Sequence, residues 1–139
     1  MRVMVLVKAT ADSEAGQMPS AALLEAMGQF NAALAEAGLL VAGEGLKPTA
    51  EGRRVAFDGA ERRLSEGPFA PAEAQVAGFW LWQVRDMEEA VAWARRCPNP
   101  MPGPSEIEIR PLYEMADFAP AMSPDQQAQD AALRQRAGA

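Results

Sequence analysis

Histidine is absent from this chain of 139 residues, and cysteine occurs only once, as Cys97. Without histidine the chain has no imidazole ligand for a metal ion and no imidazole general base. A single cysteine cannot form an internal disulfide, which is typical of proteins in a reducing compartment. We therefore expect no metal site and no cofactor.

Long apolar runs and clusters of basic residues are also missing. No segment approaches the roughly 18 apolar residues of a membrane-spanning helix, and the first residues, MRVMVLVK, form too short a run for a signal peptide. The 13 basic residues are scattered among 19 acidic ones, and the net charge is −6. Because phosphate backbones are bound by clustered positive charge, nucleic acid is not an expected partner. We expect a cytoplasmic protein that does not contact a membrane.

Apolar residues make up 49% of the chain and charged residues 23%, which is ordinary for a globular protein. The most informative segment is residues 78–84, GFWLWQV, in which Trp80 and Trp82 alternate with other apolar side chains. Residues 3–7 form a second strand of the same kind. A strand with two apolar faces must be covered on both. Helices can cover one face, and we expect a second copy of the chain to cover the other.

Residues that typically begin and end helices lie between the expected strands. Ser20 is a suitable N-cap for a helix that Gly38 ends, and the apolar stripe of this helix includes Leu24. Asp86 begins a second helix, which stops before Pro98. Residues 9–19 are expected to form a loop.

A hairpin is expected between residues 46 and 65, and an edge strand near residues 106–110. The resulting order is strand, helix, strand and hairpin, strand, helix, strand. This order predicts an α+β protein with a ferredoxin-like split βαβ arrangement and an antiparallel sheet.

The composition changes near the C-terminus. We expect one domain over residues 1–118 and a tail over residues 119–139. Ser123, Pro124 and Gln126 resemble a capping box, which favours a short helix over about residues 124–136. A frayed tail is the alternative, because Leu133 is the only large apolar residue of that segment.

Four segments together resemble the YCII-related proteins, in the branch named for its DGPF motif. They are GEGLKP at 43–48, SEGPFAP at 65–71, the GFWLWQV strand, and EIEIRPLYEM at 106–115. The resemblance covers about residues 1–118. It implies a ferredoxin-like protomer that pairs through its sheet into a dimeric α/β barrel. It also implies an association with extracytoplasmic-function sigma factors, and hence a regulatory role.

The chain departs from the family pattern at the positions where chemistry is expected. The His and Asp pair that the resemblance implies as an active site cannot operate without histidine. Lys47 takes the place of the His in the GEGLHP sequence that is common in this branch. Glu66 takes the place of the Asp of DGPF. Ala70 and Pro71 follow where an acidic and a basic residue are usual.

Two turns carry candidate bases. Glu44 lies between two glycines, and Glu66 precedes Gly67 and Pro68, so a turn can fix either carboxylate at the rim of a cleft as a general base. Alternatively, these turns are purely structural and both acids are solvated. Lys8, at the end of a central strand, either holds an anionic ligand or extends into solvent.

The sheet supplies the candidate ligand-binding residues. Trp80 and Trp82 either line a ligand cleft or fill a dry dimer interface. Glu108 and Arg110 are expected on the side of the sheet away from the helices, where they either complete a polar and aromatic cleft or form a solvated pair.

Two functions remain open. The first is a homodimer that binds a small organic molecule at the sheet face, without catalysis and in a regulatory role. The second is a cofactor-free isomerase or lyase with Glu44 or Glu66 as its base, in which Lys8 or Arg110 holds an anionic substrate. The first is favoured, because a chain without histidine lacks the usual proton shuttle at neutral pH.

Overall fold

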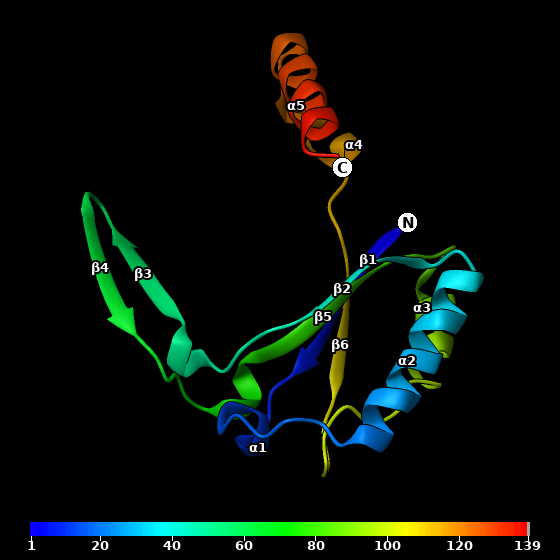
Figure 1. Cartoon of the computed structure of the whole chain (residues 1–139). Coiled ribbons are helices and arrows are strands. Elements are labelled where there is room, and N and C mark those ends of the chain that lie inside the picture. Colours follow the sequence, from blue (N-terminus) through cyan, green and yellow to red (C-terminus); the bar gives the residue numbers. More distant parts are fainter. Residues whose placement is uncertain (139) are drawn as a thin grey trace.

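The computed structural model describes residues 1–138 and has an α+β architecture (Figure 1). Four strands form an antiparallel sheet in the order β2-β5-β1-β6, namely β2 (Leu40–Gly45), β5 (Val76–Gln83), β1 (Arg2–Lys8) and β6 (Ile107–Pro111). Helices α2 (Ala21–Glu36) and α3 (Met87–Ala94) lie on one face of this sheet. The α+β class and the antiparallel sheet are therefore confirmed. The sheet is open and does not close into a barrel within the described chain.

The remaining elements are short or stand apart. Strands β3 (Arg53–Asp58) and β4 (Glu61–Glu66) pair only with each other. The other helices are α1 (Ala11–Glu14), α4 (Met115–Phe118) and α5 (Pro124–Arg136), and the 3₁₀ turns are η1 (Thr49–Glu51), η2 (Ala72–Ala74) and η3 (Ala119–Ala121).

Helix ends follow the expected capping chemistry. The Ser20 side chain accepts a hydrogen bond from the Leu23 amide at 3.1 Å, and Gly38 follows α2 with a φ of +79°. Asp86 caps α3 by accepting from the Glu89 amide at 2.9 Å. Ser123 and Gln126 form the capping box of α5, so a C-terminal helix is confirmed. Helix α1 was not expected; Thr10 and Ser13 form its capping box.

The hydrophobic core lies between the sheet and the two helices. Trp80 and Trp82 face α2, with 6% and 0% of their surface exposed, and Phe30 packs edge-on against both. This corrects the prediction that the two indoles line a ligand cleft or a dimer interface. Leu24 is likewise misassigned to the core, because it is 58% exposed.

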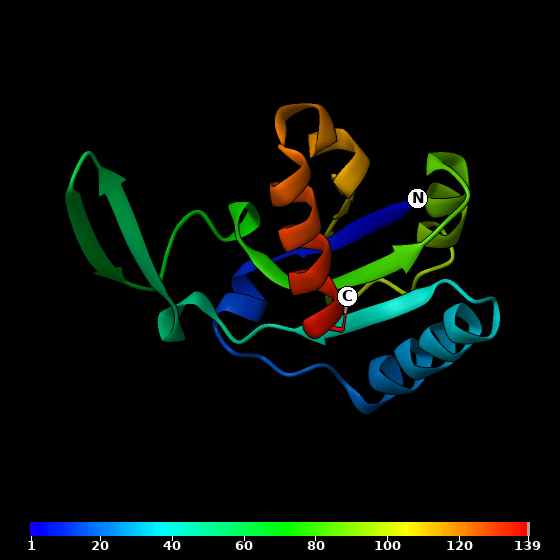
Figure 2. The ribbon, with the colours of Figure 1, turned by 90° about the horizontal axis from the view of Figure 1, so that it is seen from above.

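The β3–β4 hairpin, called the arm (residues 53–66), projects away from the sheet (Figures 1 and 2). Every residue of its two strands is exposed. Val55 and Leu64 lie opposite each other, and Phe57 lies two residues from Val55 on the same side. Because an isolated two-stranded hairpin is only marginally stable in water, the base of the arm must hold it in place.

Candidate functional site

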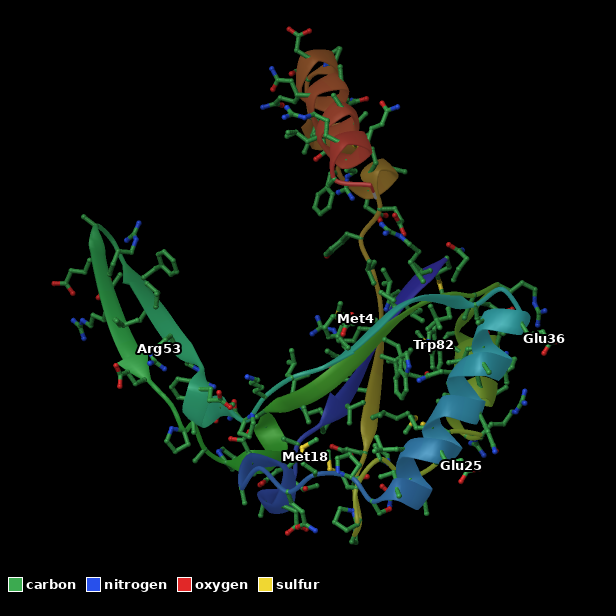
Figure 3. All side chains as sticks on the ribbon, viewed as in Figure 1. Met4, Met18, Glu25, Glu36, Arg53 and Trp82 are labelled. Atoms are coloured by element: carbon green, nitrogen blue, oxygen red, sulfur yellow. The ribbon has the colours of Figure 1, made fainter. Side chains whose placement is uncertain are left out.

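The side of the sheet opposite α2 and α3 is called the open face. Its centre is an apolar stripe in which Met4 lies opposite Leu81 and Leu6 lies opposite Phe79. All four side chains are half-buried. Figure 3 shows Met4 and Trp82 on opposite sides of the sheet, with Trp82 toward α2. The helices of the sheet therefore leave this stripe uncovered.

Charged residues border the stripe on both edge strands. Glu108 and Arg110 on β6 lie opposite Leu6 and Met4, whereas Ile107 and Ile109 pack against the core, as the alternation predicts. The Arg110 Nε and Glu108 Oε2 atoms are 4.0 Å apart, and the side chains are 73% and 50% exposed. Such an exposed pair contributes little to stability and leaves both groups able to meet a ligand.

The other predicted site residues are dispersed. Glu44 lies on β2 opposite Phe79, at the far edge of the sheet from Arg110. The two edge strands are separated by roughly 14 Å, since neighbouring strands are spaced about 4.8 Å apart. Lys8 donates to the Ala74 carbonyl at 3.4 Å.

Glu66 is on the arm, 3.7 Å from the Arg53 Nε atom, and its side chain is 70% exposed. Glu66 and Glu44 thus belong to different sheets. One chain does not gather the predicted residues around one small molecule.

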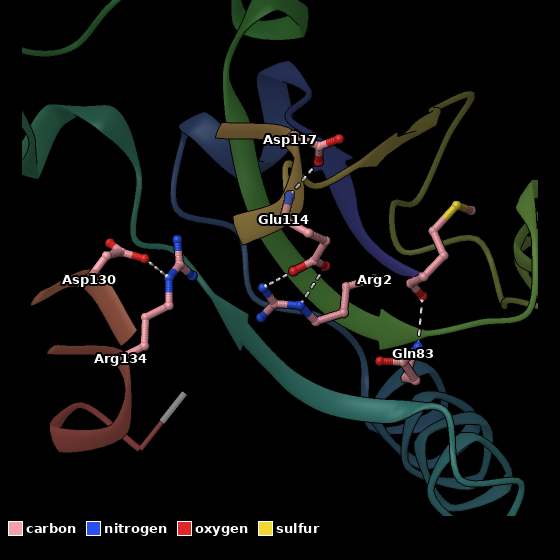
Figure 4. A network of polar contacts seen from close by, with 7 residues as sticks. Arg2, Gln83, Glu114, Asp117, Asp130 and Arg134 are labelled. Carbon is pink, nitrogen blue, oxygen red and sulfur yellow. Dashed lines mark hydrogen bonds and ion pairs between the residues drawn. The ribbon is translucent and has the colours of Figure 1, made fainter. Parts of the chain in front are cut away.

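One end of the sheet is tied to the C-terminal segment (Figure 4). Arg2 donates from Nε and Nη2 to the two carboxylate oxygens of Glu114, at 2.9 and 2.8 Å. These hydrogen bonds, followed by the charges of Arg2, Arg134 and the N-terminus, lower the pKa of Glu114. The Glu114 amide donates to Asp117 at 2.7 Å, which starts α4. The ion pair therefore positions the chain that leads to α5.

The base of the arm is organised around Thr49. Its amide and hydroxyl both donate to the carboxylate of Glu14, and the hydroxyl accepts from the Phe69 amide at 2.9 Å. The Gly67 amide donates to Gly52 at 3.2 Å. The GEGLKP and SEGPFAP segments lead into this one cluster, which we call the arm base.

One glycine in each of the GEGLKP and SEGPFAP segments lets the backbone pack closely against a neighbouring residue. A Cβ atom on Gly67 would lie 1.6 Å from the Thr49 carbonyl oxygen, and one on Gly43 would lie 2.7 Å from Cδ1 of Trp80. Neither glycine has a positive φ, so close approach, and not backbone conformation, requires glycine here. The segments therefore have a structural role whatever their acids do.

A shallow depression of about 460 Å³ lies beside the arm base. Arg54 stacks on Phe69, with its Cζ atom 3.8 Å from the ring centroid, and donates from Nη2 to Gln75 Oε1 at 2.8 Å. Gln75 is buried, with 7% of its surface exposed. This arrangement was not predicted from the sequence, where the only signal is a pair of arginines within the expected hairpin.

Cys97 is unsuited to nucleophilic chemistry. Burial raises the pKa of its thiol to about 11, and Sγ donates to the Pro98 carbonyl at 3.2 Å. The thiolate, which is the reactive form, is therefore scarce at neutral pH.

Within residues 1–138, no three acidic or thiol side chains are grouped so that they could hold a metal ion. In the same part of the chain, no helix combines the length and apolar character needed to cross a bilayer.

Comparison with known proteins identifies the class. The model of the YCII-related domain matches residues 1–116, and the chain belongs to this family. An uncharacterized protein of Rhizobium meliloti is 34% identical over 77 residues. That alignment covers 55% of this chain and 62% of the relative, which is less than two thirds of the relative's length.

The close approach at Gly67 gives a direct test of the arm base. We expect Gly67→Ala to lower the free energy of unfolding by about 1–3 kcal/mol, because the added Cβ displaces the Thr49 backbone. Gly45→Ala is the matched control, since a Cβ there meets no atom within 4 Å. Urea unfolding measures both. Equal effects of the two substitutions would contradict a packing role for Gly67.

Proposed function

We propose that this protein is a homodimer in which the open faces of two sheets pack together and enclose a site for a small organic molecule. The observation that carries the proposal is the stripe of Met4, Leu6, Phe79 and Leu81, which no helix of the sheet covers. An identical stripe on a second copy is self-complementary across a two-fold axis. Burying a four-stranded face removes on the order of 1,000 Å² from water, enough for a stable interface.

The topology supports this assembly. The strand order β2-β5-β1-β6, with α2 after β1 and α3 after β5, supports a ferredoxin-like split βαβ unit. Two such sheets packed face to face make a dimeric α/β barrel. The GEGLKP and SEGPFAP segments support a place in the DGPF branch, with Glu66 in the position of its Asp.

The ligand part of the proposal rests on the borders of the stripe. Closure by a second copy brings an apolar centre together with Glu108 and Arg110, the composition of many small-molecule sites. Binding is favoured over catalysis because Glu44 and Glu66 are exposed and lie on separate sheets. This binding role suits the regulatory function that the family resemblance implies.

The dimer is tested by placing a charge on the open face. Wild type should sediment at micromolar concentration with about twice its mass of 14.9 kDa. Leu81→Glu should give a folded monomer, because each interface would bury two uncompensated carboxylates. Leu24→Glu, at an exposed position on α2, should leave the dimer intact. A monomeric wild type, or a dimer unaffected by Leu81→Glu, would disprove the assembly.

The ligand site is tested by removing the charge of Arg110. Small carboxylates, phenols and lactones are screened for thermal stabilisation of wild type, since a ligand at 100 times its dissociation constant adds about 2.7 kcal/mol. Arg110→Met should reduce stabilisation by the anionic compounds, whereas Arg85→Met, at an exposed arginine near α3, should not. If no compound stabilises wild type, the open face serves assembly alone.

A further inference from the structure

The depression beside the arm base contains an arginine without an acidic partner. Among residues 1–138, no carboxylate lies within 4.0 Å of the Arg54 guanidinium, whereas its neighbour Arg53 pairs with Glu66 at 3.7 Å. Arg54 is instead held by two neutral groups, the Phe69 ring and the Gln75 amide. Its positive charge is fixed in position but not compensated.

The support for Arg54 is rigid. Gln75 is 7% exposed, and its Nε2 donates to the Pro71 carbonyl at 3.1 Å, which directs its oxygen toward Arg54. The Gln75 backbone carbonyl accepts from the Ala9 amide at 3.0 Å, at the end of β1. The guanidinium is thus oriented before any ligand arrives, which reduces the entropic cost of binding.

The lining of the depression is basic and partly apolar. It includes the cations Lys47, Arg53 and Arg54, a single acid, Glu51, and the apolar side chains of Leu46 and Phe69. Lys47 is only loosely paired with Glu51, at 3.8 Å. The depression therefore carries a local positive charge in a chain whose net charge is −6.

We propose that this depression binds a small organic carboxylate that has an apolar body. The free edge of the Arg54 guanidinium receives the carboxylate in a bidentate pair, the geometry for which a planar fork is suited. The apolar body lies toward Leu46. All of these residues belong to one chain, and none of them is in the apolar stripe of the open face, so the site does not require a second copy.

The experiment is a titration of isotopically labelled full-length protein with sodium benzoate, followed by amide chemical shifts. Benzoate should give saturable shifts at Thr49, Phe69 and Gln75, with little change on the open face. Benzyl alcohol, which lacks the charge, and acetate, which lacks the apolar body, should each bind at least tenfold more weakly. Inorganic phosphate should also be weaker than benzoate.

Variants connect the binding to Arg54. Arg54→Gln should weaken benzoate binding at least tenfold, and Arg54→Lys, which keeps the charge but loses the fork, should have an intermediate effect. Arg63→Gln is the matched control, because Arg63 is on the same arm but pairs with Glu61 at 2.9 Å. If Arg54→Gln disturbs amide signals throughout the arm base, its weaker binding could reflect a changed structure. The role of Arg54 is then decided by whether Arg54→Lys binds benzoate more weakly than Arg63→Gln does.

Three results would overturn the proposal: no saturable shift with benzoate at millimolar concentration, equal binding of benzoate by wild type and Arg54→Lys, or binding of benzyl alcohol as tight as that of benzoate. If inorganic phosphate binds as tightly as benzoate, the site is one for inorganic anions instead. Sedimentation of Arg54→Gln should still give the wild-type oligomer, so a failure here is distinct from a failure of the dimer.

Discussion

The structure depends on one constraint: its two central strands, β1 and β5, are apolar on both faces. Helices α2 and α3 bury one face around Trp82, which is fully buried. They cannot reach the other face, where Met4 and Leu81 remain half-buried. The hydrophobic effect therefore favours burial of the second face as well, and this is the basis of the proposed assembly.

One buried polar group of the core lacks a hydrogen-bond partner among the described residues. Trp80 donates to Asn31 at 2.8 Å, whereas the Trp82 Nε1 group is buried without a partner in the described residues. Such a group costs free energy that packing must offset. The edge-on contact between Phe30 and the Trp82 indole supplies part of this offset.

The arm base links sequence segments that lie far apart. Glu14 ends α1, Thr49 begins η1 and Phe69 follows β4, and their hydrogen bonds fix the arm relative to the sheet. The same cluster orients Phe69 beneath Arg54. A structural role for the glycine-rich segments and a binding role for the depression beside them are therefore compatible.

Local signals predicted much of the fold. Ser20, Asp86 and Ser123 cap helices by contacts within three residues, which sequence spacing reveals directly. The side that the tryptophans occupy was not predictable, because alternation separates the two faces of a strand but does not say which one the helices cover. Arg54 was missed because its partner Gln75 is 21 residues away along the chain.

The central claim is that a second copy of the chain covers the open face. The most direct measurement is an isotope-filtered nuclear Overhauser experiment on a mixture of labelled and unlabelled chains. Our account predicts intermolecular contacts at the methyl groups of Met4, Leu6 and Leu81, and none at Leu34 in the core. Intermolecular contacts confined to the helices or the arm, or none at all, would contradict it.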